Sequence, residues 1–235
     1  MSGILSISSA GAFDSTPDVE YLGDVFLGER AANSTFTHTL NIGDPHPNRR
    51  ILVFNTNDYF STSPSNPTLV QTCRANGVSL PRVGQLADGF VVSTDFAVYT
   101  NRTSSWTSQI IPDGTTASFE FDCSARTYWC RVGFVRVTNL LSDNPAFQTT
   151  LGSPHTISSI PAGQIIVFTG RASSNSSSDS PTSVTNTTFL FREGSGSVST
   201  SQAPYSAFLY QNTTRQPQDV TFTPDQGGIG TVRWR

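Results

Sequence analysis

Two neighbouring stretches decide the fold: Ala117–Cys123, which reads ASFEFDC, and Cys130–Val137, which reads CRVGFVRV. In the first, apolar and polar residues alternate, and a period of two residues is typical of a strand with one buried face. In the second, apolar residues occupy both sets of positions, which predicts a strand that is buried on both faces. The linking residues, Ser124–Trp129, predict a hairpin loop between the two strands.

Similar short segments continue in both directions along the chain. Further strands are predicted at Ser34–Ile42, Arg50–Asn55, Leu69–Cys73, Val78–Val83, Phe90–Thr100, Gln164–Thr169, Thr188–Arg192, Ser206–Gln211 and Val220–Thr223. Turn residues separate them, among them Asn76-Gly77, Asp88-Gly89 and Pro161-Ala162-Gly163. The continuous apolar runs Ile51–Phe54 and Ile165–Phe168 predict central strands. Since no window shows a convincing helical period, the chain is predicted to be all-β, an antiparallel β-sandwich of jelly-roll type.

The N-terminal residues do not share this pattern. Residues 1–20 are mostly small and polar without alternation, which predicts an extended N-terminal arm before a single β-sandwich domain at residues 21–235. A subdivision near residue 145 is the alternative. The arm is predicted to dock through its apolar side chains, which are Ile4, Leu5, Ile7 and Phe13. The competing interpretation is an arm that is disordered.

Composition excludes several classes of function. Charged residues make up 13% of the 235 residues, the formal net charge is −3, and none of the 14 basic residues is lysine. This weak and balanced charge excludes a nonspecific nucleic-acid binder, which needs a basic surface. The lack of lysine excludes Schiff-base and P-loop chemistry. No apolar run approaches the ~18 residues of a membrane span, so we expect no membrane partner.

Cysteines and sequons bear on the compartment. The three cysteines, Cys73, Cys123 and Cys130, are too few for a disulfide framework, and we expect them to be buried thiols. The alternative is a bond between Cys123 and Cys130 across the predicted hairpin. The chain has five Asn-x-Ser/Thr sequons, among them Asn33 and Asn212. Most such sequons arise by chance in so Ser- and Thr-rich a chain, so we do not expect glycosylation. The N-terminus has no basic region followed by an apolar run, so we expect no signal peptide.

Charged residues offer three candidate sites. Glu120 and Asp122 share a strand face about 6–7 Å apart, a spacing that a glycoside hydrolase could use, although any solvated strand face gives the same pattern. Asp44 and His46 lie close in sequence, but no histidines have the spacing of metal ligands. Arg49-Arg50 could bind a phosphate, although a structural ion pair at a strand start is the simpler interpretation. No catalytic residue, metal or cofactor is predicted.

Aromatic residues offer two candidate interfaces. The C-terminal residues Arg233, Trp234 and Arg235 have the composition of an interface, and an ordinary edge strand is the alternative. Trp106, Tyr128 and Trp129 could stack on a sugar ring, although alternating aromatics are more often core residues.

The segment from Asp24 to Leu140 resembles a group of tailed-bacteriophage virion proteins. The resemblance depends on an order of features: Val25-Phe26-Leu27-Gly28, then a Ser/Thr-rich strand that ends in Asn41-Ile42-Gly43, then Pro45-His46-Pro47-Asn48-Arg49-Arg50 before the apolar strand Ile51–Phe54, and last the Phe-rich strand followed by Cys130-Arg131-Val132-Gly133-Phe134. About half of the chain is covered. In that group these motifs are a signature of a jelly roll.

The resemblance implies a non-enzymatic structural protein of a phage virion, assembled in the host cytoplasm. We expect it to decorate or cement the capsid by binding the major capsid protein, and to bind itself as a homo-oligomer such as a trimer. One alternative is a tail-fibre or receptor-binding tail component that recognises a host surface glycan. A second alternative is a carbohydrate-active enzyme that uses Glu120 and Asp122.

Overall fold

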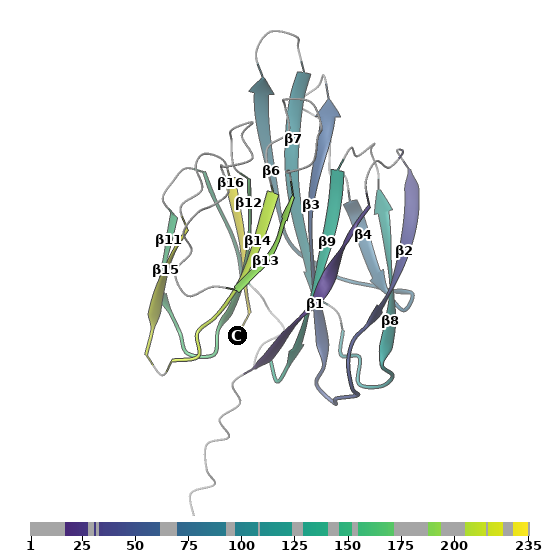
Figure 1. The fold of residues 1–235 in the computed structure, drawn as a ribbon, viewed down its shortest axis with the longest axis vertical. Helices are drawn as coiled ribbons and strands as arrows, with labels where there is room; N and C mark the ends of the chain where they lie inside the picture. The colour runs from purple at the N-terminus through teal and green to yellow at the C-terminus, as the bar shows by residue number, and fades with distance from the viewer. Residues whose placement is uncertain are drawn as a thin grey trace, which may run out of the picture.

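The computed structural model describes residues 17–27, 31, 33–61, 70–92, 97–107, 109–123, 129–140, 146–151, 155–171, 188–193, 205–214, 216–222 and 228–234, in several strands by backbone alone. These residues form sixteen strands and no helix (Figure 1). Every described strand pair is antiparallel. The predicted all-β, antiparallel class is confirmed. No helix in the described ranges is long and apolar enough to cross a membrane.

Two sheets form the first part of the chain. The five-stranded sheet has the order β1-β9-β3-β7-β6, with β1 at Asp18–Phe26, β9 at Trp129–Thr138, β3 at Arg50–Ser61, β7 at Ala97–Thr107 and β6 at Arg82–Val92. The four-stranded sheet has the order β2-β8-β4-β5, with β2 at Ser34–Asn41, β8 at Thr116–Cys123, β4 at Val70–Ala75 and β5 at Val78–Ser79.

One hydrophobic core joins these two sheets. Phe119 and Phe121 of β8 contact Phe134 of β9, with ring centroids 5.1 and 6.3 Å apart. Ile51 and Val53 of β3 belong to the same buried cluster. Each such side chain contributes about 1.5–3 kcal/mol on burial. A core shared by two facing sheets is the arrangement of a β-sandwich.

The second face of the larger sheet is buried as well. Leu52 and Phe54 of β3, and Val135 and Val137 of β9, are fully buried but lie outside the core between the sheets. The prediction that residues 130–137 are buried on both faces is confirmed. The continuous apolar run of β3 is also explained, since β3 is the middle strand of its sheet.

The predicted hairpin between residues 117–123 and 130–137 is wrong. β8 pairs with β2 and β4, whereas β9 pairs with β1 and β3 in the other sheet. The short link therefore crosses between the two layers, because alternation identifies a strand but not its partner. Cys123 and Cys130 consequently belong to different sheets; both are buried, as is Cys73, and none of the three is in a disulfide.

The remaining strands form two further sheets. One has the order β10-β16-β12-β14-β13, with β10 at Ala146–Leu151, β16 at Gly228–Trp234, β12 at Ile165–Arg171, β14 at Tyr205–Gln211 and β13 at Thr188–Glu193; the other pairs β11, His155–Ile160, with β15, Gln218–Phe222. β16 is an interior strand, so the edge position considered for the C-terminus is wrong. The Gln211 amide donates a hydrogen bond to the carbonyl of Pro17, so the two parts of the chain touch. The single domain and its subdivision near residue 145 stay predictions.

Local differences from the predicted elements have physical causes. β1 begins at Asp18, so residues 18–20 belong to a sheet and not to the arm. A bulge between Tyr21 and Gly23, whose φ is 111°, hides this strand by breaking its alternation. Asn76-Gly77 is the predicted turn, with positive φ at both residues. Asp88-Gly89, in contrast, lies inside β6.

Candidate functional site

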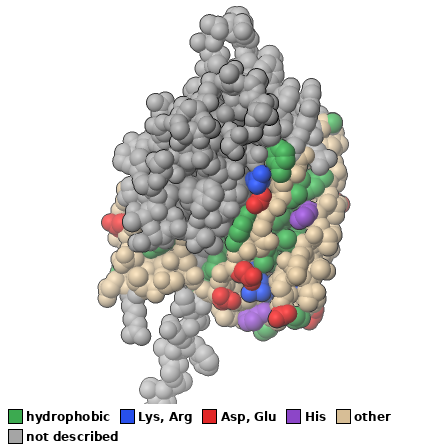
Figure 2. Space-filling view, in the orientation of Figure 1, with side chains coloured by type: hydrophobic (Ala, Val, Ile, Leu, Met, Phe, Trp, Pro, Cys, Tyr) green, Lys and Arg blue, Asp and Glu red, His purple; other side chains and the backbone are tan. Residues whose placement is uncertain are grey.

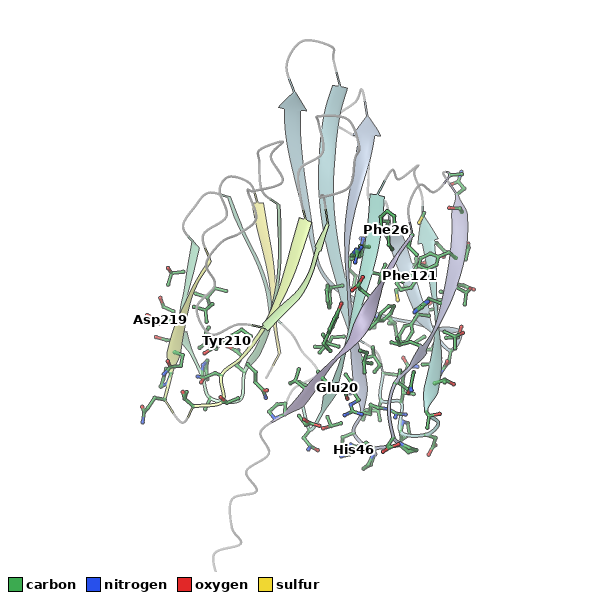
Figure 3. The ribbon with its side chains drawn as sticks, in the orientation of Figure 1. Glu20, Phe26, His46, Phe121, Tyr210 and Asp219 are labelled. Atoms are coloured by element: carbon green, nitrogen blue, oxygen red, sulfur yellow. The ribbon has the colours of Figure 1, made fainter. Side chains whose placement is uncertain are left out.

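A polar cleft lies at one end of the first pair of sheets. It has a volume of about 340 Å³ and is lined by Asp18, Asp44, Pro45, His46, Arg136, Thr138 and Asn139. The start of β1, the end of β9 and the loop after β2 supply these residues. Figure 3 shows His46 and Glu20 at this end of the molecule, and Figure 2 shows acidic, basic and histidine side chains gathered there.

Arg49 fixes the loop that forms one wall of the cleft. Its side chain is fully buried, and it donates hydrogen bonds to the backbone carbonyls of two loops. Nε donates to the carbonyl of Ile111 at 2.9 Å. Nη1 donates to the carbonyls of Gly43 at 2.8 Å and Asp44 at 2.5 Å, with a weaker contact to that of Ile42 at 3.4 Å. Nη2 donates to the carbonyls of Asp113 at 2.9 Å and Gly114 at 2.7 Å. A single guanidinium thereby joins residues 42–44 to residues 111–114.

The structure corrects both earlier interpretations of this arginine. In the described residues the partners of Arg49 are backbone carbonyl groups rather than carboxylates, and its side chain is too buried for a phosphate to reach it. Burial, and after it the charge of Arg136, lowers the pKa of Arg49. An arginine nevertheless stays protonated in a protein. The interior therefore contains a permanent cation that backbone dipoles solvate.

Arg136 is the cation of the cleft, and acidic side chains already neutralise it. Its Nη2 lies 2.6 Å from Glu20 and 3.8 Å from Asp18. Gly43 lies so close that a Cβ there would collide with the guanidinium of Arg136. The φ of 75° at Gly43 favours a glycine at this position of the loop, and a Cβ there would also force the end of the Arg136 side chain to shift.

His46 has a defined tautomer in the cleft. The N–H of Asn48 donates to its Nδ1 at 3.2 Å, so the neutral ring carries its proton on Nε2. In the described ranges, no group of three or more His, Cys, Asp or Glu side chains could hold a metal ion. His38 does not join His46, because it lies on β2 and stacks on Phe134. The lining can hydrogen-bond a small polar ligand, and it shows no catalytic arrangement that would identify a reaction.

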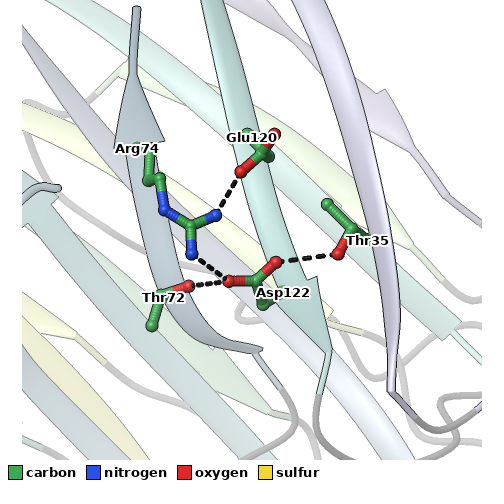
Figure 4. A network of polar contacts seen from close by, with 5 residues as sticks. All are labelled: Thr35, Thr72, Arg74, Glu120 and Asp122. Carbon is green, nitrogen blue, oxygen red and sulfur yellow. Dashed lines mark hydrogen bonds and ion pairs between the residues drawn. The ribbon is translucent and has the colours of Figure 1, made fainter. Parts of the chain in front are cut away.

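Glu120 and Asp122 share one face of β8, as the alternation predicts. Arg74 of β4 binds both of them, reaching Asp122 at 2.7 Å, and Thr35 and Thr72 donate to Asp122 at 2.8 and 2.5 Å (Figure 4). The bond from Thr72, with those from Thr35 and Arg74, lowers the pKa of Asp122 against the opposing effect of burial. A general acid needs a raised pKa. The lowered pKa of Asp122 does not suit that role. The contacts of the pair instead form a cross-strand network that links β2, β8 and β4.

The other predicted site residues are only partly placed. Ile4, Leu5, Ile7, Phe13, Tyr128 and Arg235 lie outside the described residues. Only the backbone is described for Trp106, Trp129, Arg233 and Trp234. Trp106 is opposite Val53 and Trp129 is opposite Asp58, on the two sides of β3. Five residues along a strand correspond to about 16 Å, so the backbones of these two positions are well separated along β3, and the stacking surface stays a prediction.

Asn212 shows that one sequon is structural. Its side chain is fully buried and donates to the carbonyls of Ile160 at 2.7 Å and Gln216 at 3.0 Å. Its Oδ1 accepts from the N–H and the hydroxyl of Thr214. A glycan cannot be attached to an amide that is enclosed in this way. The sequence singles out Arg49 and Asn212 for other reasons and does not predict these structural roles, because most of their partners are backbone groups that leave no sequence signal.

Comparison with known proteins adds no assignment: no protein-family model matches the chain, and no curated protein or solved structure matches it significantly.

Proposed function

We propose that eight of the first nine strands form a jelly roll, with β6 added at the edge of the larger sheet beside β7. Their pairings are nested: β1 pairs with β9, β2 with β8, β3 with β7 and β4 with β5. Nested pairs arise when one long antiparallel hairpin is rolled up, so that successive pairs alternate between two sheets. β1 and β3 indeed lie in one sheet, and β2 and β4 in the other. This is the strand order expected of two linked Greek keys.

We propose further that the protein is a non-enzymatic structural component of a phage virion that decorates or cements the capsid. The observation that carries this proposal is the coincidence of two features along the chain. The nested strands span residues 18–138, and the resemblance to tailed-phage virion proteins spans Asp24 to Leu140. Two residues of the resembling motifs, Gly43 and Arg49, occupy positions on which the loops depend. The resemblance therefore supports the architecture, and the function follows from it by analogy.

The charge distribution fits a protein that packs densely with others. Ion pairs engage Arg74 with Glu120 and Asp122, Arg131 with Asp24, and Arg136 with Glu20. Little unbalanced charge is left on this part of the surface, so neighbouring copies repel one another weakly. In the proposed arrangement the sandwich binds the major capsid protein, and residues 1–16 anchor it to adjacent subunits through Ile4, Leu5, Ile7 and Phe13. Many identical weak contacts then stabilise the shell together.

Copy number in purified particles tests the proposal. Quantitative mass spectrometry should find the chain in near proportion to the major capsid protein, and a chain that lacks residues 1–16 should be lost from the particles. A few copies per particle would favour the tail component instead. Absence from particles would reject a virion role. Release of sugar from host polysaccharide by the wild-type chain, with loss of that activity in Glu120→Gln, would replace the proposal with an enzyme.

A further inference from the structure

Among the described strands, β2 is an edge strand that lacks the usual protection against pairing with another chain. It is the last strand in the order β2-β8-β4-β5, and in the described residues β8 is the strand that pairs with it. Its sequence, STFTHTLN, contains no Asp, Glu, Lys, Arg, Pro or Gly. It pairs with β8 over its whole length without a register shift. Proteins normally protect such an edge with charges, proline or a bulge, because its backbone can pair with another chain.

The other edges of the described sheets are protected or shorter than β2. β11 and β15 form a two-stranded sheet whose pairing has a register shift, and β15 carries Asp219. β1 has a bulge at Gly23 and three acidic residues, β6 has a register shift near Gly84, and β13 has a register shift with Arg192 and Glu193. β5 is only two residues long. β10 is regular and uncharged, but it has six residues and lies close to β6. β2 is therefore the longest regular edge without protection in the described sheets.

The two faces of β2 suit a partner strand. The side chains of Thr35, Thr37 and Thr39 are exposed, whereas those of Phe36, His38 and Leu40 are half-buried at the margin of the core. Phe36 stacks on Phe121 at 4.7 Å and His38 on Phe134 at 5.6 Å, so the strand is held in place. Figure 2 shows hydrophobic side chains reaching the surface beside β1 and β2. A further strand along β2 would cover this margin.

We propose that the strand which occupies this edge is β2 of a second copy, paired antiparallel about a two-fold axis at Thr37. In this register Thr37 lies opposite the partner's Thr37, and Thr35 lies opposite the partner's Thr39. Phe36 lies opposite the partner's His38 on the inner face. The two four-stranded sheets then become one continuous sheet across the dimer. Cross-strand threonine pairs and aromatic pairs are stabilising, and no like charges meet.

The second copy is favoured because the sequence of β2 is self-complementary about Thr37. The exposed positions of the central segment are all Thr, so the reversed strand places Thr opposite Thr at each of them. In a symmetric dimer the same surface meets itself, and this strand is compatible with that arrangement. This proposal names a surface for the self-association that the resemblance to virion proteins implies, and in that sense it rests on the proposed function. Its test uses the purified chain rather than particles, so the two proposals can fail separately.

Light scattering coupled to size-exclusion chromatography is the first test. The full wild-type chain should be a dimer, and Thr37→Lys should weaken dimerisation by at least about tenfold, because it places two lysines directly opposite each other. Val78→Lys adds the same charge at the opposite edge of the same sheet and should leave the dimer intact. A monomeric wild-type chain, a Thr37→Lys dimer, or equal losses in the two variants would overturn the proposal.

Cysteine cross-linking tests the register without adding charge. Thr37→Cys should form an intermolecular disulfide on mild oxidation, because directly opposite Cβ atoms lie about 4.5–5.5 Å apart, close to disulfide geometry. Thr35→Cys should not, since two such residues would be offset by about 13 Å along the strands. The three native cysteines are buried and should not interfere. Equal cross-linking of the two variants, or none in Thr37→Cys, would overturn the two-fold pairing even if Thr37→Lys proves poorly folded.

Discussion

Replacement of Arg49 should destabilise the fold more than replacement of any surface arginine. Its guanidinium donates to the carbonyls of Gly43, Asp44, Ile111, Asp113 and Gly114, and it is fully buried. Arg49→Lys keeps the charge but offers three donors from a single nitrogen in place of five donors in a planar fork. Arg49→Met keeps much of the volume and removes every donor. The two variants therefore separate charge from hydrogen-bond geometry.

The expected magnitude follows from the number of carbonyls that lose a partner. Hydrogen bonds to a charged group contribute about 1.5–3 kcal/mol each, so a plain sum over five would equal most of the ~5–15 kcal/mol that stabilises a whole domain. Loop relaxation and entering water must recover part of this loss. We therefore expect about 2–3 kcal/mol for Arg49→Lys and about 4–5 kcal/mol for Arg49→Met, near the upper end of single substitutions.

Urea unfolding followed by tryptophan fluorescence measures these differences as free energies of unfolding. Arg74→Lys is the matched control, because the same change at a half-exposed ion pair should alter stability little. Amide exchange should also rise at residues 42–44 and 111–114 in Arg49→Lys. If Arg49→Lys is as stable as the wild-type chain, or Arg49→Met is more stable, the carbonyl contacts do not hold the loops and the reasoning is refuted.

Three further changes test other parts of the structure. Asn55→Val should raise the free energy of unfolding by about 1–2 kcal/mol in the same urea assay, since the buried Asn55 amide has no hydrogen-bond partner in the described residues, and a loss of stability would contradict this. Asn212→Asp should cost about 2–4 kcal/mol at pH 7, because a carboxylate would face the carbonyls of Ile160 and Gln216; Asn212→Ser, which brings no charge, should cost less. The pKa of Asp122 is lowered in the folded state, so this carboxylate stabilises the fold above its ordinary pKa of about 3.9, and that stability is lost as the pH falls through the folded-state pKa. Asp122→Asn should therefore reduce the fall of the melting temperature at acid pH. An unchanged dependence of melting temperature on pH would count against the network.

The sequence predicts individual strands well where every residue on one face of the strand is apolar. Alternation over residues 117–123 locates β8 to within one residue, and the apolar run at residues 51–54 identifies the middle strand of a sheet. Partners are not encoded in this way, because every antiparallel strand offers the same backbone groups to its neighbour. For that reason the link between β8 and β9 was expected to be a hairpin, although it crosses between sheets. β1 escaped notice because the Gly23 bulge interrupts its period.

The candidate site shows the same limit. Glu120 and Asp122 are recognisable as a pair, since they share a strand face, but Arg74 becomes their partner only through the pairing of β4 with β8. Arg49 and Arg50 are adjacent and alike in sequence, yet one is fully buried among carbonyls and the other is half-buried. The positions of carbonyl groups depend on loops that the sequence does not specify. A site built from backbone acceptors is therefore found only in three dimensions.

The nested pairing of the strands also sets the order of events during synthesis. Phe26 of β1 pairs with Arg131 of β9, so about 100 residues must follow β1 from the ribosome before its partner strand exists. At about 5–20 residues per second, this delay lasts roughly 5–20 s. During that time β2 is also exposed without β8, although it carries no charge to discourage aggregation. The nascent chain is therefore most prone to aggregation before β9 has emerged, and faster elongation should increase the yield of folded protein.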